Sequence, residues 1–501
     1  MIKTLKRLLS AFLAFVMTAV SVSGLLVTPT LAATTTYGDF KVTTSDGTCS
    51  YADNVLTISG EGTYTIEMAD GVTSTSTDRI IIEENVSLSK YDTVITLKDV
   101  NISSDSGAPI NIVDTANYWY SGVILKLSGT NVLTATNTIN SYGFSSTSNS
   151  GYAGLQKDAN GALQITSVDG DGSTTGSLTA SGGDGGAGIG GGFYGSCNDI
   201  IINGGTISAT GGQGGAGIGS GYKGDCSNIT INGGIIIADS GEGGAGIGSG
   251  YYGYANDIEI NGGTITANGI VADSSSTYNV SGAGIGGGSS GVVDNIEIND
   301  GIIIAESEDS AGIGGGWATS SDTLHSGYGM GIVINGGTIT AIGGSTSAGI
   351  GGSSNGGGLY SSGEGSNITI NGGTVTAKSG IYTAASIGGG SKGDGKNITI
   401  NGGYINLSMP SAPASSTSSA DYIGGGKNGT TGTVNILGGY FTIGSLSKNT
   451  VYNVTPNFPL ITVSNVETST KSTYPYTVGY IQSLEISDSP WGFGKFFPNG
   501  F

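Results

Sequence analysis

The sequence predicts an all-β protein, a right-handed parallel β-helix with three short strands in each coil of about 29 residues and a cap at each end. The main observation is a recurring phrase of the form Ala-Gly-Ile-Gly-Gly-Gly. Its Ile falls at positions 189, 218, 247, 285, 313, 350, 387 and 423. Short alternating apolar segments follow each phrase, and helical periodicity is absent. Units of this length bury their apolar faces only against their neighbours, so they stack into a rod.

The unit from 187 to 209 illustrates one coil. Three segments, at 187–189, 200–203 and 206–209, alternate apolar residues with Gly or polar residues, as strands with one buried face do. Glycines separate the segments where the chain must bend. Each strand can pair in parallel with its equivalent in the next coil, because the rest of the coil supplies the long connection. The fixed positions favour this stacking over the antiparallel blades of a β-propeller.

An asparagine recurs before the bend that follows the second strand of each coil. Its positions are Asn203, Asn232, Asn261, Asn299, Asn335, Asn371 and Asn401, and Leu437 replaces it in the last copy. Stacked amides can hydrogen-bond up and down such a column. We therefore expect a structural ladder rather than a catalytic row.

The three cysteines do not form the framework of a disulfide-rich protein. Cys197 and Cys226 each lie eight residues after a repeat Ile, so they occupy the same place in consecutive coils, and Ala255 occupies it in the third. Parallel Cβ vectors hold the two sulfur-bearing carbons wider apart than a disulfide needs. We expect two stacked, buried thiols, with a disulfide as the alternative.

The first 33 residues have the order of a secretory signal peptide. Lys3, Lys6 and Arg7 precede an apolar run from 8 to 26, and small residues follow up to Ala33. A single N-terminal membrane anchor is the alternative, because the apolar run approaches the length of a spanning helix. We expect export to the extracellular space or the bacterial cell surface, with no membrane span in the mature chain.

The sequence divides into five regions. We assign 1–33 to the signal peptide, 34–80 to an N-terminal cap with the first strands, 81–180 to irregular β-helix coils, 181–444 to the regular glycine-rich repeats and 445–501 to a C-terminal cap or partial module. Caps are expected because a terminal coil would otherwise present an unpaired edge.

The net charge of −20 argues against nucleic acid as a partner. An acidic surface suits a soluble extracellular protein, or one that collects divalent cations. A disordered acidic chain is excluded, since apolar residues are plentiful and periodic. We expect a monomer.

The phrases Gly-Gly-Ala-Gly-Ile-Gly-Gly-Gly, beginning at 185, and Ile-Asn-Gly-Gly-Thr-Ile-Thr-Ala, beginning at 260, resemble the glycine-rich repeat surface proteins of clostridia-type Gram-positive bacteria. Such proteins are similar to carbohydrate-binding, right-handed β-helices of the wider pectate-lyase-like architecture. The resemblance implies a cell-surface rod with a glycan partner. The sequence shows no Leu-Pro-x-Thr-Gly sorting signal and no recognisable wall-binding repeat, which argues against covalent attachment to the wall.

Catalytic candidates are sparse. Arg79 is the one arginine after the signal region and lies in the expected cap, whereas lyases of this architecture need a basic residue at the substrate. Hydrolysis needs paired carboxylates about 5 to 9.5 Å apart. Asp169 with Asp171, and Glu306 with Glu308, are adjacent only in sequence. The single histidine, His325, has no second histidine to share a zinc ion. We therefore expect no enzymatic activity.

Aromatic residues supply the strongest binding signal. Four residues after the repeat Ile come Phe193, Tyr222, Tyr251 and Trp317, and Tyr194 and Tyr252 immediately follow two of them. Stacked coils would place successive rings about 4.8 Å apart. Aromatic rings offer sugars an apolar face together with a polar handle. The pattern predicts a carbohydrate-binding strip, with a stack that merely stabilises turns as the alternative.

Acidic residues suggest a weaker, calcium-binding column. Asp184, Glu242 and Glu308 each lie five residues before a repeat Ile, and Gln213 has the same place in a further coil. Ca²⁺ takes six to eight oxygen ligands and can be shared by neighbouring carboxylates. A solvated acidic edge is the alternative.

Together these patterns predict a non-enzymatic surface rod that binds polysaccharide along one face. A polysaccharide lyase or hydrolase is the first alternative. The second is a structural spacer or adhesin that binds protein through the longer loops, at 268–281, 317–331, 352–366 and 407–422.

Overall fold

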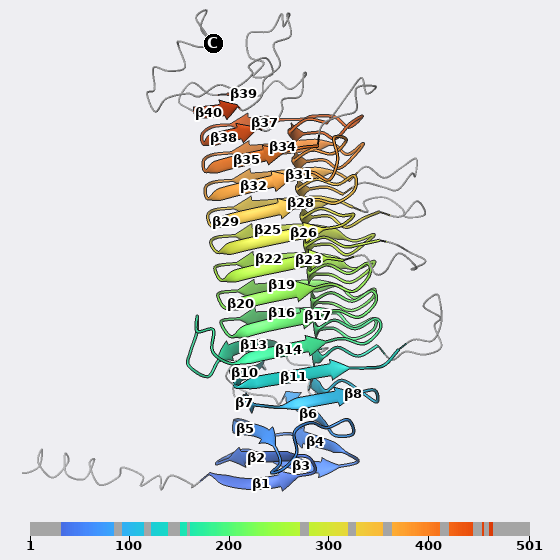
Figure 1. Ribbon diagram of the computed structural model, residues 1–501, viewed down its shortest axis with the longest axis vertical. Helices are drawn as coiled ribbons and strands as arrows, with labels where there is room; N and C mark the ends of the chain where they lie inside the picture. The colour runs from blue at the N-terminus through green and yellow to red at the C-terminus, as the bar shows by residue number, and fades with distance from the viewer. Residues whose placement is uncertain are drawn as a thin grey trace, which may run out of the picture.

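The computed structural model describes residues 32–84, 93–114, 122–138, 151–157, 161–270, 280–318, 327–353, 363–410, 420–443, 453–454 and 460–463. Within this part of the chain the strands stack into a long rod, with early residues at one end and late residues at the other (Figure 1). The predicted signal region up to residue 31, His325 and most of 445–501 lie outside the described residues.

Three sheets run the length of the rod, and each regular coil contributes one strand to each sheet. We name them A, B and C. Sheet A contains β1 (Ala33–Tyr37), β2 (Phe40–Thr44), β5 (Gly62–Met68), β7 (Thr93–Lys98), β10 (Gly122–Ser128), β13 (Ala162–Ser167), β16 (Cys197–Ile202), β19 (Cys226–Ile231), β22 (Tyr254–Ile260), β25 (Val292–Ile298), β28 (Gly329–Ile334), β31 (Gly365–Ile370), β34 (Gly395–Ile400), β37 (Val434–Ile436) and β39 (Asn453–Val454).

Sheet B carries the repeat phrase, and its regular strands are only two residues long. It contains β3 (Cys49–Ala52), β4 (Val55–Ile58), β6 (Arg79–Glu84), β9 (Ile110–Asp114), β12 (Leu155–Lys157), β15 (Ile189–Gly190), β18 (Ile218–Gly219), β21 (Ile247–Gly248), β24 (Ile285–Gly286), β27 (Ile313–Gly314), β30 (Ile350–Gly351), β33 (Ile387–Gly388) and β36 (Ile423–Gly424).

Sheet C follows the asparagine-containing corner of each coil. It contains β8 (Asn101–Ser104), β11 (Thr130–Ala135), β14 (Ser177–Ser181), β17 (Thr206–Thr210), β20 (Ile235–Asp239), β23 (Thr264–Gly269), β26 (Ile302–Ser307), β29 (Thr338–Ile342), β32 (Thr374–Lys378), β35 (Tyr404–Ser408), β38 (Tyr440–Ile443) and β40 (Leu460–Val463). The predicted fold, an all-β solenoid of stacked parallel strands, is confirmed.

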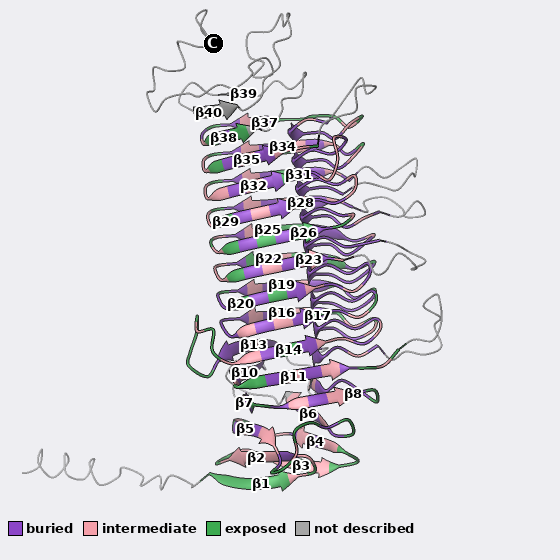
Figure 2. Cartoon of the chain, viewed as in Figure 1, coloured by how far each residue is buried: buried purple, intermediate pink, exposed green. Residues whose placement is uncertain are grey.

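The core consists of columns of aliphatic side chains that repeat from coil to coil. In sheet A, Ile200 pairs in register with Ile229, and Ile229 with Ile258. In sheet B, Ile189, Ile218 and Ile247 form a second column, and all of these side chains are essentially fully buried (Figure 2). Burying each stabilises the fold by roughly 1.5–3 kcal/mol, and only stacking of coils provides that burial.

Glycine in sheet B allows the coils to approach closely. Gly219 has a φ of +145°, and a Cβ placed on it would lie 1.7 Å from the carbonyl oxygen of Gly248 in the next coil. No side chain fits there without moving the backbone. The glycine that follows each repeat Ile is therefore required by the stacking.

The asparagine ladder is confirmed. In successive coils, the side-chain amide of each asparagine donates to the side-chain oxygen of the one before it, from Asn232 to Asn401, over 2.7–2.9 Å. This ladder links the corner between sheets A and C across seven coils.

The two repeat cysteines are stacked thiols, as predicted. Cys197 and Cys226 pair in register, are buried and are free. Burial raises the pKa of the Cys226 thiol well above its ordinary value, and a hydrogen bond with Cys197 adds to this effect. Ala255 continues the same column.

The N-terminal end of the rod departs from parallel stacking. β1 pairs with β2 and β2 with β5 in antiparallel fashion, and β3 pairs antiparallel with β4. These strands cover the first edges of sheets A and B, which would otherwise offer unpaired backbone groups. Within the described residues, no helix is long and apolar enough to cross a membrane.

Candidate binding site at the aromatic turns

The candidate site lies where the chain turns from sheet B to sheet A. In one coil the turn runs from Gly192 to Gly195, and the Gly195 N–H donates to the Gly192 carbonyl over 2.7 Å. The same bond recurs from Gly224 to Gly221 and from Gly253 to Gly250, at 2.9 and 3.0 Å. Five of the six aromatic residues singled out in the sequence are central residues of these turns: Phe193, Tyr194, Tyr222, Tyr251 and Tyr252.

The second central residue of each turn has the left-handed backbone conformation. Tyr194, Lys223 and Tyr252 have φ values of 60°, 57° and 65°. Turns of this kind normally place Gly or Asn there, because a Cβ is strained at positive φ. These bulky side chains are therefore held at some energetic cost, which is a feature that concentrates at functional sites.

Backbone hydrogen bonds join the turns of neighbouring coils. The Tyr194 N–H donates to the Tyr222 carbonyl over 2.9 Å, and the Lys223 N–H donates to the Tyr251 carbonyl over 2.8 Å. The Tyr252 N–H continues the series to Ser289 over 2.9 Å. The side chains of the turns are thus carried on a continuous, rigid edge.

The first central residues of these turns and Trp317, which also lies four residues after a repeat Ile, form an inner row, defined as Phe193, Tyr222, Tyr251 and Trp317. Phe193 stacks on Tyr222 with ring centroids 5.4 Å apart and planes 11° apart, and Tyr222 lies 5.8 Å from Tyr251. Tyr222 and Tyr251 are only 5% and 4% exposed. Their rings pack within the turns and have little free surface to offer a ligand.

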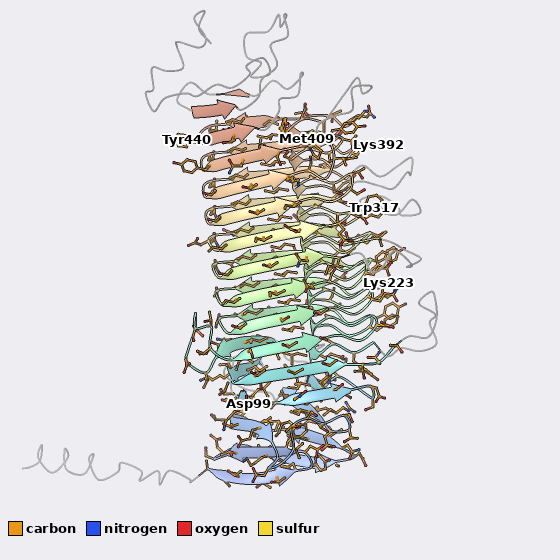
Figure 3. The ribbon with its side chains drawn as sticks, viewed as in Figure 1. Asp99, Lys223, Trp317, Lys392, Met409 and Tyr440 are labelled. Carbon is orange, nitrogen blue, oxygen red and sulfur yellow. The ribbon has the colours of Figure 1, made fainter. Side chains whose placement is uncertain are left out.

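The second central residues form an outer row, defined as Tyr194, Lys223 and Tyr252. Tyr194 and Tyr252 are 48% and 36% exposed. The Lys223 ammonium lies between them, 5.9 Å from the Tyr194 ring and 5.5 Å from the Tyr252 ring, and 5.3 Å from the Tyr222 ring beneath. Lys223 and Trp317 lie along the same edge of the rod (Figure 3).

The structure changes the sequence interpretation of these six aromatics in one respect. The interpretation treated the column four residues after the repeat Ile as the ligand-facing strip, yet Tyr222 and Tyr251 are buried there, and Phe193 and Trp317 are half-buried. For the inner row, the alternative of a turn-stabilising stack fits better. Of the predicted residues, Tyr194 and Tyr252 have the exposed rings, and Lys223 is an addition that the sequence did not suggest.

The three acidic residues predicted for calcium lie on alternate coils beside this edge. Asp184 is half-buried, Glu242 is buried and Glu308 is exposed, and Gln213 donates to Glu242 over 3.0 Å from the coil between the first two. Alternate coils are roughly 9.6 Å apart, farther than one ion can bridge directly. In the described part of the chain no group of three or more Asp, Glu, His or Cys side chains is arranged to hold a metal ion.

A neighbouring carboxyl, Asp309, has an unusual environment. Burial raises its pKa from an ordinary value of 3.8 to about 6, and the adjacent Glu308 charge adds to the rise. Both effects disfavour the ionised form.

The catalytic candidates from the sequence are not assembled. Asp171 accepts a hydrogen bond from Thr166, and Asp169 accepts one from Thr175, so both are tied into one local bend. Glu306 lies on β26 of sheet C and Glu308 just after it, both exposed. Arg79 begins β6 near the N-terminal end of the rod.

A groove that the sequence analysis missed lies on the outer face of sheet A. It has a volume of about 320 Å³ and is lined by Asp199, Ile201, Asn228, Thr230, Asp257, Ile258, Glu259, Asn295 and Glu297. Asp199, Asn228, Asp257 and Asn295 have φ values between 54° and 66°, which bulges their strands. Asn228 donates to Asp199 over 3.1 Å, and Asn295 donates to Asp257 over 2.5 Å. The alternation of Asp and Asn ten residues after the repeat Ile was the available signal.

Comparison with protein families agrees with the coil as the unit. Six segments match a family described as Beta helix repeat: residues 200–222, 229–251, 258–289, 296–317, 332–354 and 368–391. Each match ends four residues after a repeat Ile. The stacked parallel sheets show a β-helix fold, and the matched segments lie within its regular coils. Comparison with curated proteins and with solved structures gives no significant match.

Proposed function

We propose that this chain is an exported, non-enzymatic β-helix protein of the bacterial surface or surroundings that binds polysaccharide along its aromatic turn edge. The outer row of Tyr194, Lys223 and Tyr252 is the observation that carries the proposal. Two exposed rings flank an ammonium group on adjacent coils, and all three residues occupy a backbone conformation that normally selects Gly or Asn.

The chemistry of the outer row suits a sugar chain. Tyrosine rings give C–H-rich sugar faces an apolar contact, and their hydroxyls remain available for hydrogen bonds. The Lys223 ammonium has three donors, so it can bind ring hydroxyls or the carboxylate of a uronic acid. Tyr194 and Tyr252 lie two coils apart, roughly 9.6 Å along the rod. The ligand is therefore an extended chain that runs parallel to the rod axis.

Export rests on the order of residues at the N-terminus, outside the described part of the chain. Mass spectrometry of protein recovered from the medium or the cell envelope would test it. A new N-terminus near Ala33 is expected, whereas retention of the full apolar segment would favour a membrane anchor.

The binding proposal is tested by retention of the purified chain on a panel of neutral and acidic polysaccharides. Tyr194→Ala with Tyr252→Ala should abolish retention, because these two rings supply the exposed apolar surface on which a sugar ring would stack. Tyr440→Ala is a matched control, since Tyr440 is also an exposed tyrosine, at 44%, but lies on sheet C. The panel is run with Ca²⁺ and with chelator, and loss of retention in chelator would support the calcium prediction.

Two results would count against the proposal. Full retention by the double variant would remove the outer row from the binding site. Absence of retention on every polysaccharide, combined with binding to surface proteins, would favour the spacer or adhesin alternative.

The groove on sheet A favours a second candidate, a polysaccharide hydrolase. Glu259 and Glu297 pair in register on adjacent strands, so their backbones are about 4.8 Å apart. Retaining glycosidases place their two carboxyl groups about 5–5.5 Å apart. Release of reducing ends from the same panel, lost in Glu297→Gln, would establish this activity. Retention without any released product would support the binding rod.

A further inference from the structure

The outward side of sheet C carries a grid without charges at the first and third positions of its strands. Its first and third strand positions, from β14 to β35, pair in register from coil to coil. We call these residues the sheet C face: Ser177, Thr179, Thr206, Ser208, Ile235, Ile237, Thr264, Thr266, Ile302, Ile304, Thr338, Thr340, Thr374, Thr376, Tyr404 and Asn406. In a chain of net charge −20, this face is neutral throughout.

Large apolar side chains are exposed on this face. Ile235 and Ile237 on β20 are 40% and 43% exposed, and Ile302 and Ile304 on β26 are 55% and 38% exposed. Several exposed apolar side chains gathered on one face are typical of an interaction site. The neutrality of the face excludes partners that bind by charge.

Large and small strands alternate along the face. Isoleucine strands β20 and β26 are separated and flanked by the threonine and serine strands β17, β23 and β29. The isoleucines therefore form two ridges two coils apart. The hydroxyl strand between them, β23, forms a trough. β-branched side chains have few rotamers, so this relief is rigid.

We propose that the sheet C faces of two copies of this chain pack together as an antiparallel homodimer, with the two-fold axis parallel to the strands and between β23 and β26. The pitch of ridges and troughs is identical in the two copies. Rotation about this axis places β26 of one copy over β23 of the other, and β20 over β29. The β26 ridge of each copy then enters the trough at β23 of the other, and each β20 ridge lies over the threonines of β29. This proposal replaces the expectation of a monomer and is independent of the polysaccharide proposal.

The same axis also matches the ends of the face. It places β35 over β14, so that the exposed ring of Tyr404 faces the small Ser177 of the other copy. It places β32 over β17, where threonine and serine face threonine. A parallel arrangement, with the axis along the rod, would instead set isoleucine ridges against each other.

Charges at the rim of the face agree with the axis. The fifth positions of successive strands are Thr210, Asp239, Asn268, Glu306, Ile342 and Lys378. The rotation places Glu306 opposite Asn268, Asp239 opposite Ile342 and Lys378 opposite Thr210. No two like charges meet, although the rim holds two carboxylates.

The sheet C face and its rim together are large enough for a dimer. Eight strands at about 4.8 Å spacing cover about 38 Å, and five residues at about 3.3 Å cover about 16 Å. The footprint is about 600 Å² on each copy, or about 1,200 Å² in total. Specific interfaces begin at about 1,000–1,200 Å².

Sedimentation equilibrium of the full chain tests the proposal. We expect twice the chain mass, falling to the single mass on dilution. Ile304→Lys should raise the dimer dissociation constant at least ~30-fold, because a charge would be buried without a partner. Thr369→Lys, the same charge change on the outer face of sheet A, is the control and should leave the constant unchanged.

A second variant avoids any effect on folding. Ile302→Thr with Ile304→Thr converts β26 to the Thr-Ile-Thr sequence already present in β23 and β29, so the coil should fold normally. The loss of one ridge from each copy should raise the dissociation constant at least ~10-fold. A native chain that is monomeric up to its solubility limit, or a dimer that both isoleucine variants leave intact, would overturn the proposal.

Cross-linking tests the orientation. Within one chain, Thr210 and Lys378 lie five coils apart, roughly 24 Å along the rod. A zero-length carbodiimide bond between Lys378 and the carboxylate introduced by Thr210→Asp can therefore form only between copies. We expect this bond in the covalent dimer. A covalent dimer without it would contradict the antiparallel axis.

Discussion

Two corners of the same coil stack by different means. At the corner between sheets A and C, one residue type is repeated from Asn203 to Asn401, and its side chain makes the bond to the next coil. At the turn between sheets B and A, backbone bonds join the coils, and the outer position changes from Tyr194 to Lys223 to Tyr252. Where a side chain carries the stacking, its identity is fixed. Where the backbone carries it, the side chain is available for a ligand.

The largest expected effect on stability comes from substitution of Gly219, which lies in sheet B and not at either corner. Gly219→Ala should destabilise the rod by about 4 kcal/mol or more, because its Cβ would collide with the Gly248 carbonyl and its φ is positive. Chemical denaturation measures the loss.

Gly71→Ala is the matched control for that clash. Gly71 also has a positive φ, +83°, but no atom lies within 4 Å of a Cβ placed there. A loss of only about 1–2 kcal/mol is expected from backbone strain alone. Equal losses for the two variants would mean that close stacking at Gly219 contributes nothing.

The asparagine corner predicts the next effect. Asn261→Ala removes the amide that donates to Asn232 and the oxygen that accepts from Asn299. A loss of about 2 kcal/mol in the free energy of unfolding is expected for two hydrogen bonds. Asn406→Ala is the control, because among the described residues its side chain bonds only to Thr376, over a long 3.4 Å. A similar loss in both variants would show that the ladder adds nothing to stacking.

The sequence was enough to predict which residues stack in columns from coil to coil, but not which side chains are exposed on the surface. Spacing and alternation are enough for Ile189, Asn203 and Cys197, because a period-2 strand in a fixed repeat has one possible inward face. The exposure of Tyr194 rather than Tyr222 depends on a turn with positive φ at its second central residue. Residue preferences place Gly or Asn there, so the sequence alone did not indicate which of the two aromatic positions would be exposed.

Other surfaces depend on neighbours that spacing alone does not reveal. The groove at Asp257 needs a bulge in sheet A, which appears only as a left-handed φ. The alternation of isoleucine and threonine strands on sheet C was legible in the sequence. The ridges that this alternation forms can be recognised only when the strands are known to lie side by side.

A smaller effect on stability is expected from Asp309, the carboxyl beside Glu308. Asp309 should lower stability as pH rises from about 4 to about 6, because its pKa is raised in the folded state and the folded chain holds the proton longer. Asp309→Asn should therefore stabilise the chain by about 1 kcal/mol at pH 7, after allowance for solvent screening, and leave stability unchanged below pH 4. Thermal unfolding across this range measures both. An equal gain at low pH would contradict a role for ionisation.

The smallest expected effect on stability is the most informative about function. Lys223→Gly relieves the strain of a side chain at φ 57° but removes contacts with three tyrosine rings, each within 6 Å of the ammonium. Strain relief and the lost cation–π energy are each about 1 kcal/mol, so the free energy of unfolding should change by less than about 0.5 kcal/mol. Retention on an acidic polysaccharide should nevertheless fall. A large loss of stability with unchanged retention would make the outer row a structural feature like the asparagine ladder, and the contrast between the two corners would disappear.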